Sequence, residues 1–203
     1  MNPNPLNELH ASHPAFGKML DDLIREGKVR YIGHSNFTGW QIAEAEFTAR
    51  ERLLERFVSA QNHYSLLVRG AEREVLPAAR RFGLGFLPFF PLRSGMLTGK
   101  YTREGGPEGS RIMTSPNGAE FMRDTPWDAL EAYQAYCDAK GISMLEATFG
   151  WLLAQPGLSS VIAGATTAEQ VRANVAAAGW RPTPTESAEI GALFPLPADP
   201  AAG

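Results

Sequence analysis

The sequence predicts an α/β fold with a parallel sheet, because short strand-like runs alternate with helical patterns. Four β-branched or aromatic runs, at 29–32, 57–60, 84–87 and 158–162, are each followed by a loop and then a helical pattern. Strands joined by helices pair in parallel, either in an open doubly wound sheet or in a closed barrel. No G-x-G-x-x-G follows any of these runs, which disfavours the dinucleotide-binding open sheet.

The number of strand–helix units suggests half of a barrel. A (β/α)8 barrel takes about 250 residues, and this chain has four such units in 203 residues. We therefore expect a partial TIM-type (β/α)8 barrel of about four βα units.

Capping boxes predict where helices begin, because a Ser or Thr hydroxyl accepts a hydrogen bond from a free backbone N–H and the residue three later reaches back. The boxes are Thr38 with Gln41, Ser143 with Glu146, and Thr167 with Gln170. Thr125 followed by Pro126 predicts a further helix start. The apolar stripes that follow these starts are typical of core-facing helix surfaces.

One long polar segment precedes the last predicted helices. Residues 101–124 are too many for a routine connection, so we expect either a functional lid or disorder. The residues after Phe194, which are rich in Pro, Ala and Gly, are expected to form a loose end at 195–203.

Composition excludes several classes of function. The formal net charge of -3 and the pI near 5.8 come without a basic run, so we expect no binding to nucleic acid or to an anionic membrane. The single cysteine, Cys137, is interpreted as a buried apolar residue in a reducing compartment. His34 and His63 lack partners at metal-ligand spacing and are interpreted as surface or loop residues. Without a signal peptide or an unbroken apolar stretch, the protein is expected to be cytoplasmic.

Polar residues follow each predicted strand, where α/β barrels bind ligands. Ser35 and Asn36 follow the first strand and Gln61 follows the second. Such side chains offer both donors and acceptors, which suits a planar carboxamide such as that of nicotinamide, and Phe89 is placed to stack on its ring. The backbone N–H groups of the helix capped at Thr167 favour phosphate, although a capping Thr is usually only a cap.

The chain resembles the C-terminal half of the aldo-keto reductases. Four motifs occur in order: LDDLIREGKVRYIGHSNF, VSAQNHYSLLVRGAEREVLPAARRFGLG, PFFPLRSGMLTGKY with PEGSR, and WLLAQPGLSSVIAGATTAEQVRANV. The resemblance implies a (β/α)8 barrel that uses NADP(H) to reduce carbonyl compounds, with this chain as units 5 to 8. It implies a half-barrel over 20–194, preceded by a divergent N-terminal remnant over 1–19.

The resemblance also assigns cofactor-binding roles to individual residues. The carboxamide end would be held by Ser35, Asn36 and Gln61, with Phe89 in place of the usual ring-stacking tyrosine; the pyrophosphate by Leu92, Arg93, Ser94, Lys100 and Arg111; and the adenosine phosphate end by Gly164, Thr166, Gln170 and Asn174. Relatives that prefer NADP often carry an arginine at the position of Thr166, and some have a glutamate where Ala173 stands. NAD(H) therefore remains open as the cofactor.

The catalytic residues of the family are not found. The family uses a tyrosine, a lysine, an aspartate and a histidine on its earlier strands. None of the four lysines, Lys18, Lys28, Lys100 and Lys140, follows a predicted strand at its C-terminal end. The sequence therefore predicts a truncated or misannotated oxidoreductase that is inactive alone and takes a small carbonyl substrate only if its barrel is completed.

Two other functions stay open at this point. One is a non-catalytic nicotinamide-binding regulator, like the potassium-channel beta subunits that share this barrel. The other is an assembly module that keeps its cofactor residues only by descent. Because a half-barrel exposes two sheet edges, at 29–32 and 158–162, we expect a homodimer through these edges or aggregation.

Overall fold

The computed structural model describes residues 14–196, and these residues form an α/β structure with two compact units. Unit 1 consists of residues 14–63, 70–89 and 156–160, and unit 2 of residues 64–69, 90–155 and 161–196. Most of the predicted N-terminal remnant and of the C-terminal tail lies outside the described residues.

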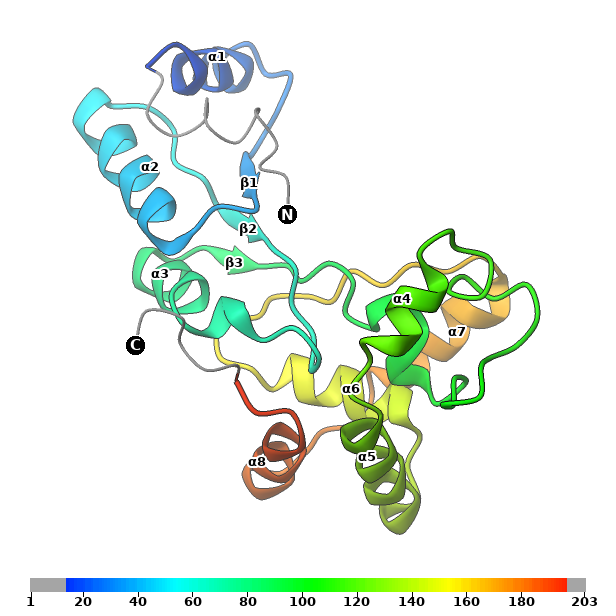
Figure 1. Cartoon of the computed structure of the whole chain (residues 1–203). Helices are drawn as coiled ribbons and strands as arrows, with labels where there is room; N and C mark the ends of the chain where they lie inside the picture. The colour runs from blue at the N-terminus through cyan, green and yellow to red at the C-terminus, as the bar shows by residue number, and fades with distance from the viewer. Residues whose placement is uncertain (1–13, 197–203) are drawn as a thin grey trace, which may run out of the picture. The chain divides into compact units, whose positions relative to one another are not determined.

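Unit 1 contains a parallel three-stranded sheet, which confirms the α/β class and the parallel pairing predicted from the sequence (Figure 1). Along the chain its elements are α1 (Pro14–Arg25), β1 (Gly33–Ser35), α2 (Gly39–Arg52), β2 (Ser59–Gln61), η2 (Gly70–Glu72), α3 (Val75–Phe82) and β3 (Gly85–Phe86). The strand order is β1-β2-β3. Ala60 and Phe86 are fully buried and place the core of unit 1 against the sheet.

The first strand begins four residues later than predicted. Residues 29–32 lie outside β1, because the backbone N–H groups of Lys28 and Val29 both donate to the carbonyl of Leu23 and form a turn after α1. The strand begins at Gly33, where a side chain would collide with the hydroxyl of Ser59 on β2. A glycine is therefore required where the two strands approach most closely.

The predicted strand at 158–162 is wrong in extent. Only Leu158 pairs with the sheet, through an isolated parallel bridge to Phe86. The Phe86 N–H donates to the carbonyl of Gly157, and the Ser159 N–H donates to the carbonyl of Phe86. Beyond Ser160 the chain belongs to unit 2, so the pairing cannot continue.

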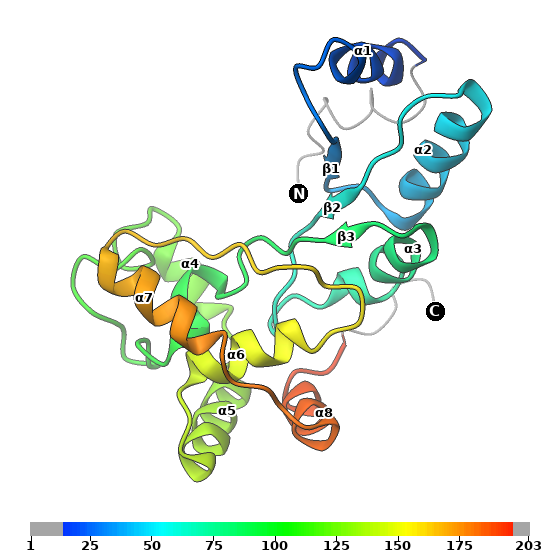
Figure 2. The ribbon, with the colours of Figure 1, turned by 180° about the vertical axis from the view of Figure 1, so that it is seen from behind.

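Unit 2 consists of helices and long connections (Figures 1 and 2). Its elements are η3 (Arg93–Thr98), α4 (Gly118–Arg123), α5 (Trp127–Lys140), α6 (Met144–Leu153), α7 (Ala168–Ala177) and α8 (Pro184–Leu193). Tyr133 of α5, Trp151 of α6 and Ile190 of α8 are buried together in its core. Helix α8 was not predicted. Two features of the sequence indicate its start, namely Pro184 at its first position and a capping box between Thr183 and Glu186.

Helices begin at all four predicted places, although the capping contacts agree with the prediction in full at only two of them. Thr38 and Ser143 form complete capping boxes. Thr167 caps α7 as predicted, but the Gln170 side chain accepts hydrogen bonds from Thr166 instead of from the cap. The prediction of a Thr125 cap is wrong, because its hydroxyl donates to the Phe121 carbonyl and so closes the end of α4.

The segment 101–124 is folded. It contains α4 and the buried Ile112, so disorder is the wrong alternative for it. Gly118 packs directly on the Ile112 carbonyl, and a Cβ at this position would clash with that oxygen. This close contact packs the start of α4 against the buried Ile112 within unit 2.

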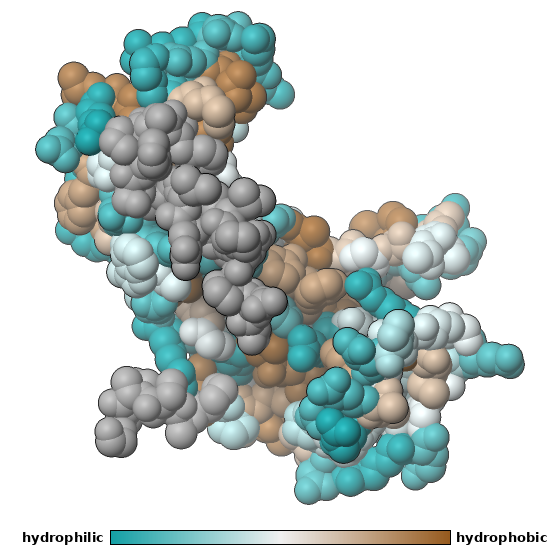
Figure 3. Space-filling view, turned by 45° about the horizontal axis from the view of Figure 1, so that its top comes forward, coloured by the Kyte–Doolittle hydropathy of each residue, from teal (hydrophilic) through white to brown (hydrophobic). Residues whose placement is uncertain are grey.

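Both units expose some large apolar side chains, and hydrophobic residues lie beside hydrophilic ones at the surface (Figure 3). Examples are Trp40 and Phe47 on α2 of unit 1, and Val171 and Val175 on α7 of unit 2. Between residues 14 and 196 there is no helix with the length and apolar character needed to cross a membrane.

Candidate functional site

The carboxamide group of candidates comes together in unit 1, at the ends of two paired strands. Ser35 and Gln61 are register partners at the C-terminal ends of β1 and β2. The Ser35 hydroxyl donates to the Gln61 carbonyl at 3.0 Å, and the Asn36 N–H donates to the same oxygen at 2.9 Å. The sheet register therefore places all three predicted residues side by side.

These residues present free polar groups at the surface. Ser35 and Asn36 are exposed and Gln61 is half-buried. Neither the Asn36 nor the Gln61 side-chain amide forms a hydrogen bond with another residue in the described range 14–196. Asn36 adopts a left-handed backbone (φ 61°), which asparagine tolerates better than most residues. Two unoccupied amides on adjacent strand ends fit a planar carboxamide, which needs both donors and acceptors.

Phe89 follows β3 at the same edge of the sheet. Its N–H donates to the Asn62 carbonyl, and its ring stacks on that of His63 with centroids 5.3 Å apart and planes inclined by 18°. Asn62 donates its side-chain amide to the Phe37 carbonyl, while its Oδ1 is buried without a hydrogen-bond partner. Asn62 directly follows Gln61 at the end of β2. Because Asn62 is buried, unlike Gln61, we interpret it as a residue that orders the strand end.

His34 lies in β1, directly before Ser35, and its interpretation as a surface or loop residue is wrong. Its side chain is buried in β1, stacked on Phe37 at 4.4 Å and edge-on to Phe57 at 5.4 Å. Both ring nitrogens are buried without hydrogen-bond partners. Burial lowers the pKa of His34 to about 4, so the ring is neutral at physiological pH.

The pyrophosphate group of candidates lies in unit 2, on a turn with an unusual backbone. Phe90, Arg93 and Ser94 have φ angles of 52°, 46° and 57°. Left-handed conformations cost non-glycine residues about 1–2 kcal/mol each, and such residues cluster at functional sites. On its buried side the turn contacts Thr148 of α6, whose hydroxyl donates to the Leu97 carbonyl at 3.4 Å.

Two cations accompany this turn. The Lys100 side chain lies against Gly95, with its Cε and Nζ atoms 2.7 and 2.9 Å from the place where a Cβ would stand. The glycine thus leaves room for the ammonium group. The Arg111 guanidinium lies over the ring of Phe90, at 5.3 Å from the centroid. Both Lys100 and Arg111 are exposed, which fits an approaching phosphate.

Lys100 also forms a contact that the sequence did not indicate. Its Nζ lies 5.2 Å from the ring centroid of Tyr101. The Tyr101 hydroxyl is engaged elsewhere, since it accepts the Ile112 N–H at 3.3 Å, and the residue is buried. Tyr101 therefore joins Lys100 to the segment that carries Ile112.

The adenosine group of candidates gathers around the start of α7. Gly164, Thr166 and Gln170 are exposed, and Asn174 is half-buried. The Gln170 Oε1 accepts the Thr166 N–H at 2.7 Å and the Thr166 hydroxyl at 3.1 Å. This pair orders the loop that enters the helix. The loop carries no cationic side chain from Gly164 to Thr167.

Outside the three candidate groups, the lysines of the described residues form ion pairs. Lys18, Lys28 and Lys140 are paired with Asp22, Glu26 and Glu186. Tyr133 is buried and its pKa is raised well above the usual value by burial. Burial also raises the pKa of Cys137 to about 12, which makes this thiol a poor nucleophile. Residues 14–196 hold no cluster of His, Cys, Asp and Glu fit for a metal ion.

Comparison with known proteins gives a family match. The model of the aldo/keto reductase family matches residues 8–193. The chain is 39% identical to the uncharacterized oxidoreductase YrpG of Bacillus subtilis over 154 residues, which are 76% of this chain and 45% of that protein.

Two further relatives differ in their described roles. The NADH-specific methylglyoxal reductase of Escherichia coli is 35% identical over 162 residues, 78% of this chain and 47% of the reductase. A putative voltage-gated potassium channel subunit beta of Schizosaccharomyces pombe is 33% identical over 166 residues, 79% of this chain and 48% of the subunit. The chain spans about half the length of these relatives.

Proposed function

Because this chain belongs to the aldo/keto reductase family of oxidoreductases, we propose that it binds NADP(H) and supplies the cofactor seat for hydride transfer to a small aldehyde or ketone. The observation that carries the proposal is the register of β1 and β2, which brings Ser35, Asn36 and Gln61 to one strand edge. The Ser35 hydroxyl and the side-chain amides of Asn36 and Gln61 would hold the carboxamide of nicotinamide and so fix which face of the ring is presented. Phe89 would stack on that ring.

In unit 2 the left-handed turn would wrap the pyrophosphate. Leu92, Arg93 and Ser94 form this turn, and Lys100 and Arg111 would neutralise the phosphate charge. The exposed residues Gly164, Thr166, Gln170 and Asn174 would surround the adenosine phosphate end. Thr166 is uncharged and gives no cation to pair with the 2′-phosphate that distinguishes NADPH from NADH. We therefore propose that NADH competes with NADPH for this site.

The bound nicotinamide supplies the hydride, and this chain's residues orient it. Reduction also needs a proton for the developing alkoxide. Tyr133 is buried with a raised pKa, and Tyr101 is buried with its hydroxyl accepting the Ile112 N–H, so neither is proposed as the donor. We therefore propose that this chain alone binds cofactor without reducing carbonyls, and that the donor belongs to units 1 to 4 of a complete (β/α)8 barrel, of which residues 20–194 are units 5 to 8.

Cofactor titration tests the first half of the proposal. NADPH and NADH are titrated separately into the chain while the cofactor fluorescence is followed. Saturable binding of at least one cofactor is expected. An absence of binding at high micromolar concentrations of both would reject the cofactor seat and would favour the assembly-module alternative.

Two pairs of variants locate the seat. Asn36→Gly and Ser94→Gly each remove a side chain while keeping a left-handed backbone, so each should weaken cofactor binding without unfolding its unit. Lys100→Gln should weaken binding about tenfold and reduce its salt dependence. Lys28→Gln is the matched control, since Lys28 pairs with Glu26 and has no proposed role; equal losses in both lysine variants would contradict the assignment.

A turnover assay separates the enzyme from a binding protein. Methylglyoxal, the substrate in the name of one relative, is added to the cofactor complex and NADPH absorbance is followed. No turnover by this chain is expected. Steady oxidation of NADPH would show that a proton donor is present after all. Binding without turnover, even after the remaining barrel units are supplied, would favour the regulatory alternative.

The same half-barrel proposal includes self-association. Among the described residues, β1 pairs only with β2, so its outer edge carries unpaired backbone groups. We propose a homodimer through such edges. Light scattering with size-exclusion chromatography should give twice the monomer mass, and a monomer that unfolds cooperatively would contradict this.

A further inference from the structure

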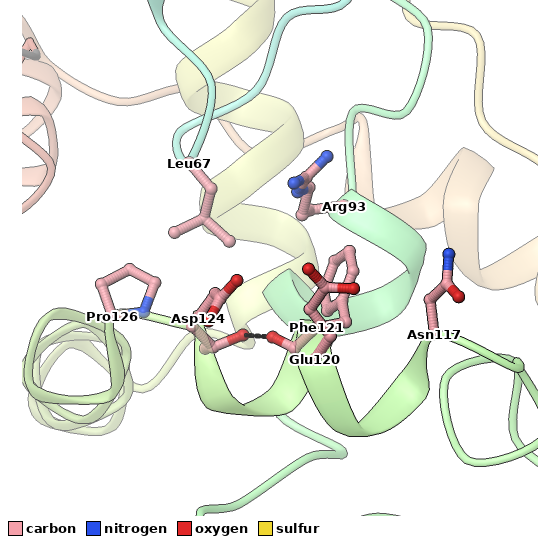
Figure 4. Close-up of a pocket in the computed structure, with 8 residues that line it drawn as sticks. Leu67, Arg93, Asn117, Glu120, Phe121, Asp124 and Pro126 are labelled. Carbon is pink, nitrogen blue, oxygen red and sulfur yellow. Dashed lines mark hydrogen bonds between the residues drawn. The ribbon is translucent and has the colours of Figure 1, made fainter. Parts of the chain in front are cut away.

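A pocket in unit 2 is lined in part by Arg93, whose backbone lies in the turn proposed for the pyrophosphate. Its volume is about 330 Å³, near the lower limit of small-molecule sites. In Figure 4, Leu67 and Arg93 lie on one side of the pocket, and residues of α4 with its flanking residues lie on the other. All lining residues belong to unit 2, so the pocket is complete within one compact unit.

Arg93 is the unusual residue of this pocket. Its guanidinium stacks on the Phe121 ring at 4.8 Å from the centroid. The side chain is half-buried, and burial lowers its pKa. No residue in the described range forms an ion pair or a hydrogen bond with this guanidinium. A cation that is partly removed from water and lacks a counter-charge is prepared to receive an anion.

Two carboxylates at the pocket have another partner. Asp124 accepts from the Arg123 Nε at 2.9 Å, and Glu120 lies 3.9 Å from a nitrogen of the same guanidinium. Both carboxylates are more than half exposed, at 61% and 64%, so solvent screens them. Arg123 is thus an ion-pair partner of both carboxylates, whereas Arg93 has no ion-pair partner among the described residues.

The remaining lining gives the shape of the ligand. Leu67, Phe121 and Pro126 present apolar surface, and Asn117 offers an amide. An arginine fork matches a carboxylate with two parallel hydrogen bonds. We propose that this pocket binds a small organic carboxylate with a flat apolar body, with Arg93 as its charge partner and the apolar residues around the body. The Arg93 backbone shapes the turn proposed for pyrophosphate, whereas its side chain serves this pocket.

The test uses benzoate and benzylamine, which have similar shapes and opposite charges. Isothermal titration calorimetry with the full chain should give saturable binding of benzoate and none of benzylamine. Inorganic phosphate, as an anion without an apolar body, should bind much more weakly than benzoate. Preferential binding of benzylamine would show that Glu120 and Asp124 dominate, and equal binding of phosphate would show that the apolar lining has no part; either result overturns the proposal.

Variants then test which charged residue of the pocket interacts with benzoate. Arg93→Gln should weaken benzoate binding at least about tenfold, and Glu120→Gln should strengthen it about twofold because a like charge is removed. Arg172→Gln is the matched control, since Arg172 is exposed on α7 and forms an ion pair with Glu169 at 3.6 Å. A loss in Arg172→Gln equal to that in Arg93→Gln would contradict a local site.

Two measurements on the unmodified chain keep the proposal testable if Arg93→Gln does not fold. Benzoate should shift the Arg93 Nε–H signal in an NMR titration, and an unmoved signal under saturating benzoate would overturn the assignment. NADPH should leave benzoate affinity unchanged. Displacement of benzoate by NADPH would assign the pocket to the cofactor instead, whereas failure of NADPH to bind at all would reject only the cofactor seat.

Discussion

In unit 1 the candidate ligand residues lie on strand ends bonded to a neighbouring strand through the backbone, whereas in unit 2 they lie on a turn that a buried side chain also holds in place. The Gln61 carbonyl receives both the Asn36 N–H and the Ser35 hydroxyl, so the strand edge is fixed mainly by the sheet itself. The turn of unit 2 has local backbone hydrogen bonds, from Arg93 to Phe90 and from Gly95 to Leu92, and the buried Thr148 hydroxyl adds one to the Leu97 carbonyl. The first arrangement tolerates side-chain substitutions, and the second should not.

The two units should also differ in how their stability depends on pH. Unit 1 buries His34 without hydrogen-bond partners, and unit 2 contains no histidine. Mild acid should therefore act on the sheet that carries the carboxamide residues and spare the helices beside the turn.

The largest expected effect is the loss of unit 1 stability on acidification. The pKa of His34 falls from 6.5 to about 4 on folding because burial disfavours the charged ring. Above pH 6.5 the ring is neutral in both states, and between 6.5 and 4 only the unfolded chain takes up the proton. Stability should therefore fall by up to about 3 kcal/mol across this window and change little further on account of His34 below pH 4.

Hydrogen exchange at pH 7.5 and pH 5 measures this, after correction for the intrinsic pH dependence of exchange. Protection of β1 and β2 should drop more than that of α5 and α6. His34→Phe is the control, because it keeps an aromatic ring against Phe37 and removes the titrating group. If this variant loses as much protection as the unmodified chain, then His34 is not the cause.

The sequence was sufficient for the parts of unit 1 that local chemistry determines. The polar pair Ser35 and Asn36 was recognised because it ends a strand-like run, and the Thr38 box marked the next helix. The strand boundary was misplaced because Val29 is bonded back to α1, a contact that β propensity does not report. His34 was misjudged for a related reason, since its burial depends on Phe37 and Phe57 packing against it.

In unit 2 the sequence identified residue types but not their surroundings. Lys100 and Arg111 were recognised as cations near a phosphate site, while the stacking of Arg93 on Phe121 joins positions 28 residues apart and has no local signal. The left-handed backbone at Ser94 was equally hidden, because serine rarely adopts it. Helix α8 could have been found from Thr183, Pro184 and Glu186.

A smaller loss of unfolding free energy should distinguish a buried hydrogen bond of unit 2 from an exposed one. Tyr133→Phe removes the hydroxyl that shares a 3.0 Å hydrogen bond with Thr148 and donates to the Met144 carbonyl. Because these buried partners then lack a hydrogen bond, the variant should lose about 1–2 kcal/mol of unfolding free energy. Denaturant titration with a probe on α5 measures the loss.

Tyr136→Phe is the matched control on the same helix, since the hydroxyl it removes contacts only the exposed Glu189. Its cost should stay below about 0.5 kcal/mol. Adding Thr148→Val to Tyr133→Phe should cost further stability, because the Leu97 carbonyl then also loses a hydrogen bond. Equal costs for the two tyrosine variants would show that the buried network does not hold unit 2.

The smallest expected change is in unit 1, and it tests whether the backbone alone fixes the strand edge. Ser35→Ala removes an exposed hydroxyl whose acceptor, the Gln61 carbonyl, still receives the Asn36 N–H. The free energy of unfolding should therefore fall by no more than about 0.5 kcal/mol, while cofactor affinity should fall measurably if the hydroxyl faces the carboxamide. Denaturant titration and NADPH titration of the same sample separate these two effects. A cost above about 1 kcal/mol would mean that side chains hold the edge of β1 as they hold the turn of unit 2, and the contrast between the two units would disappear.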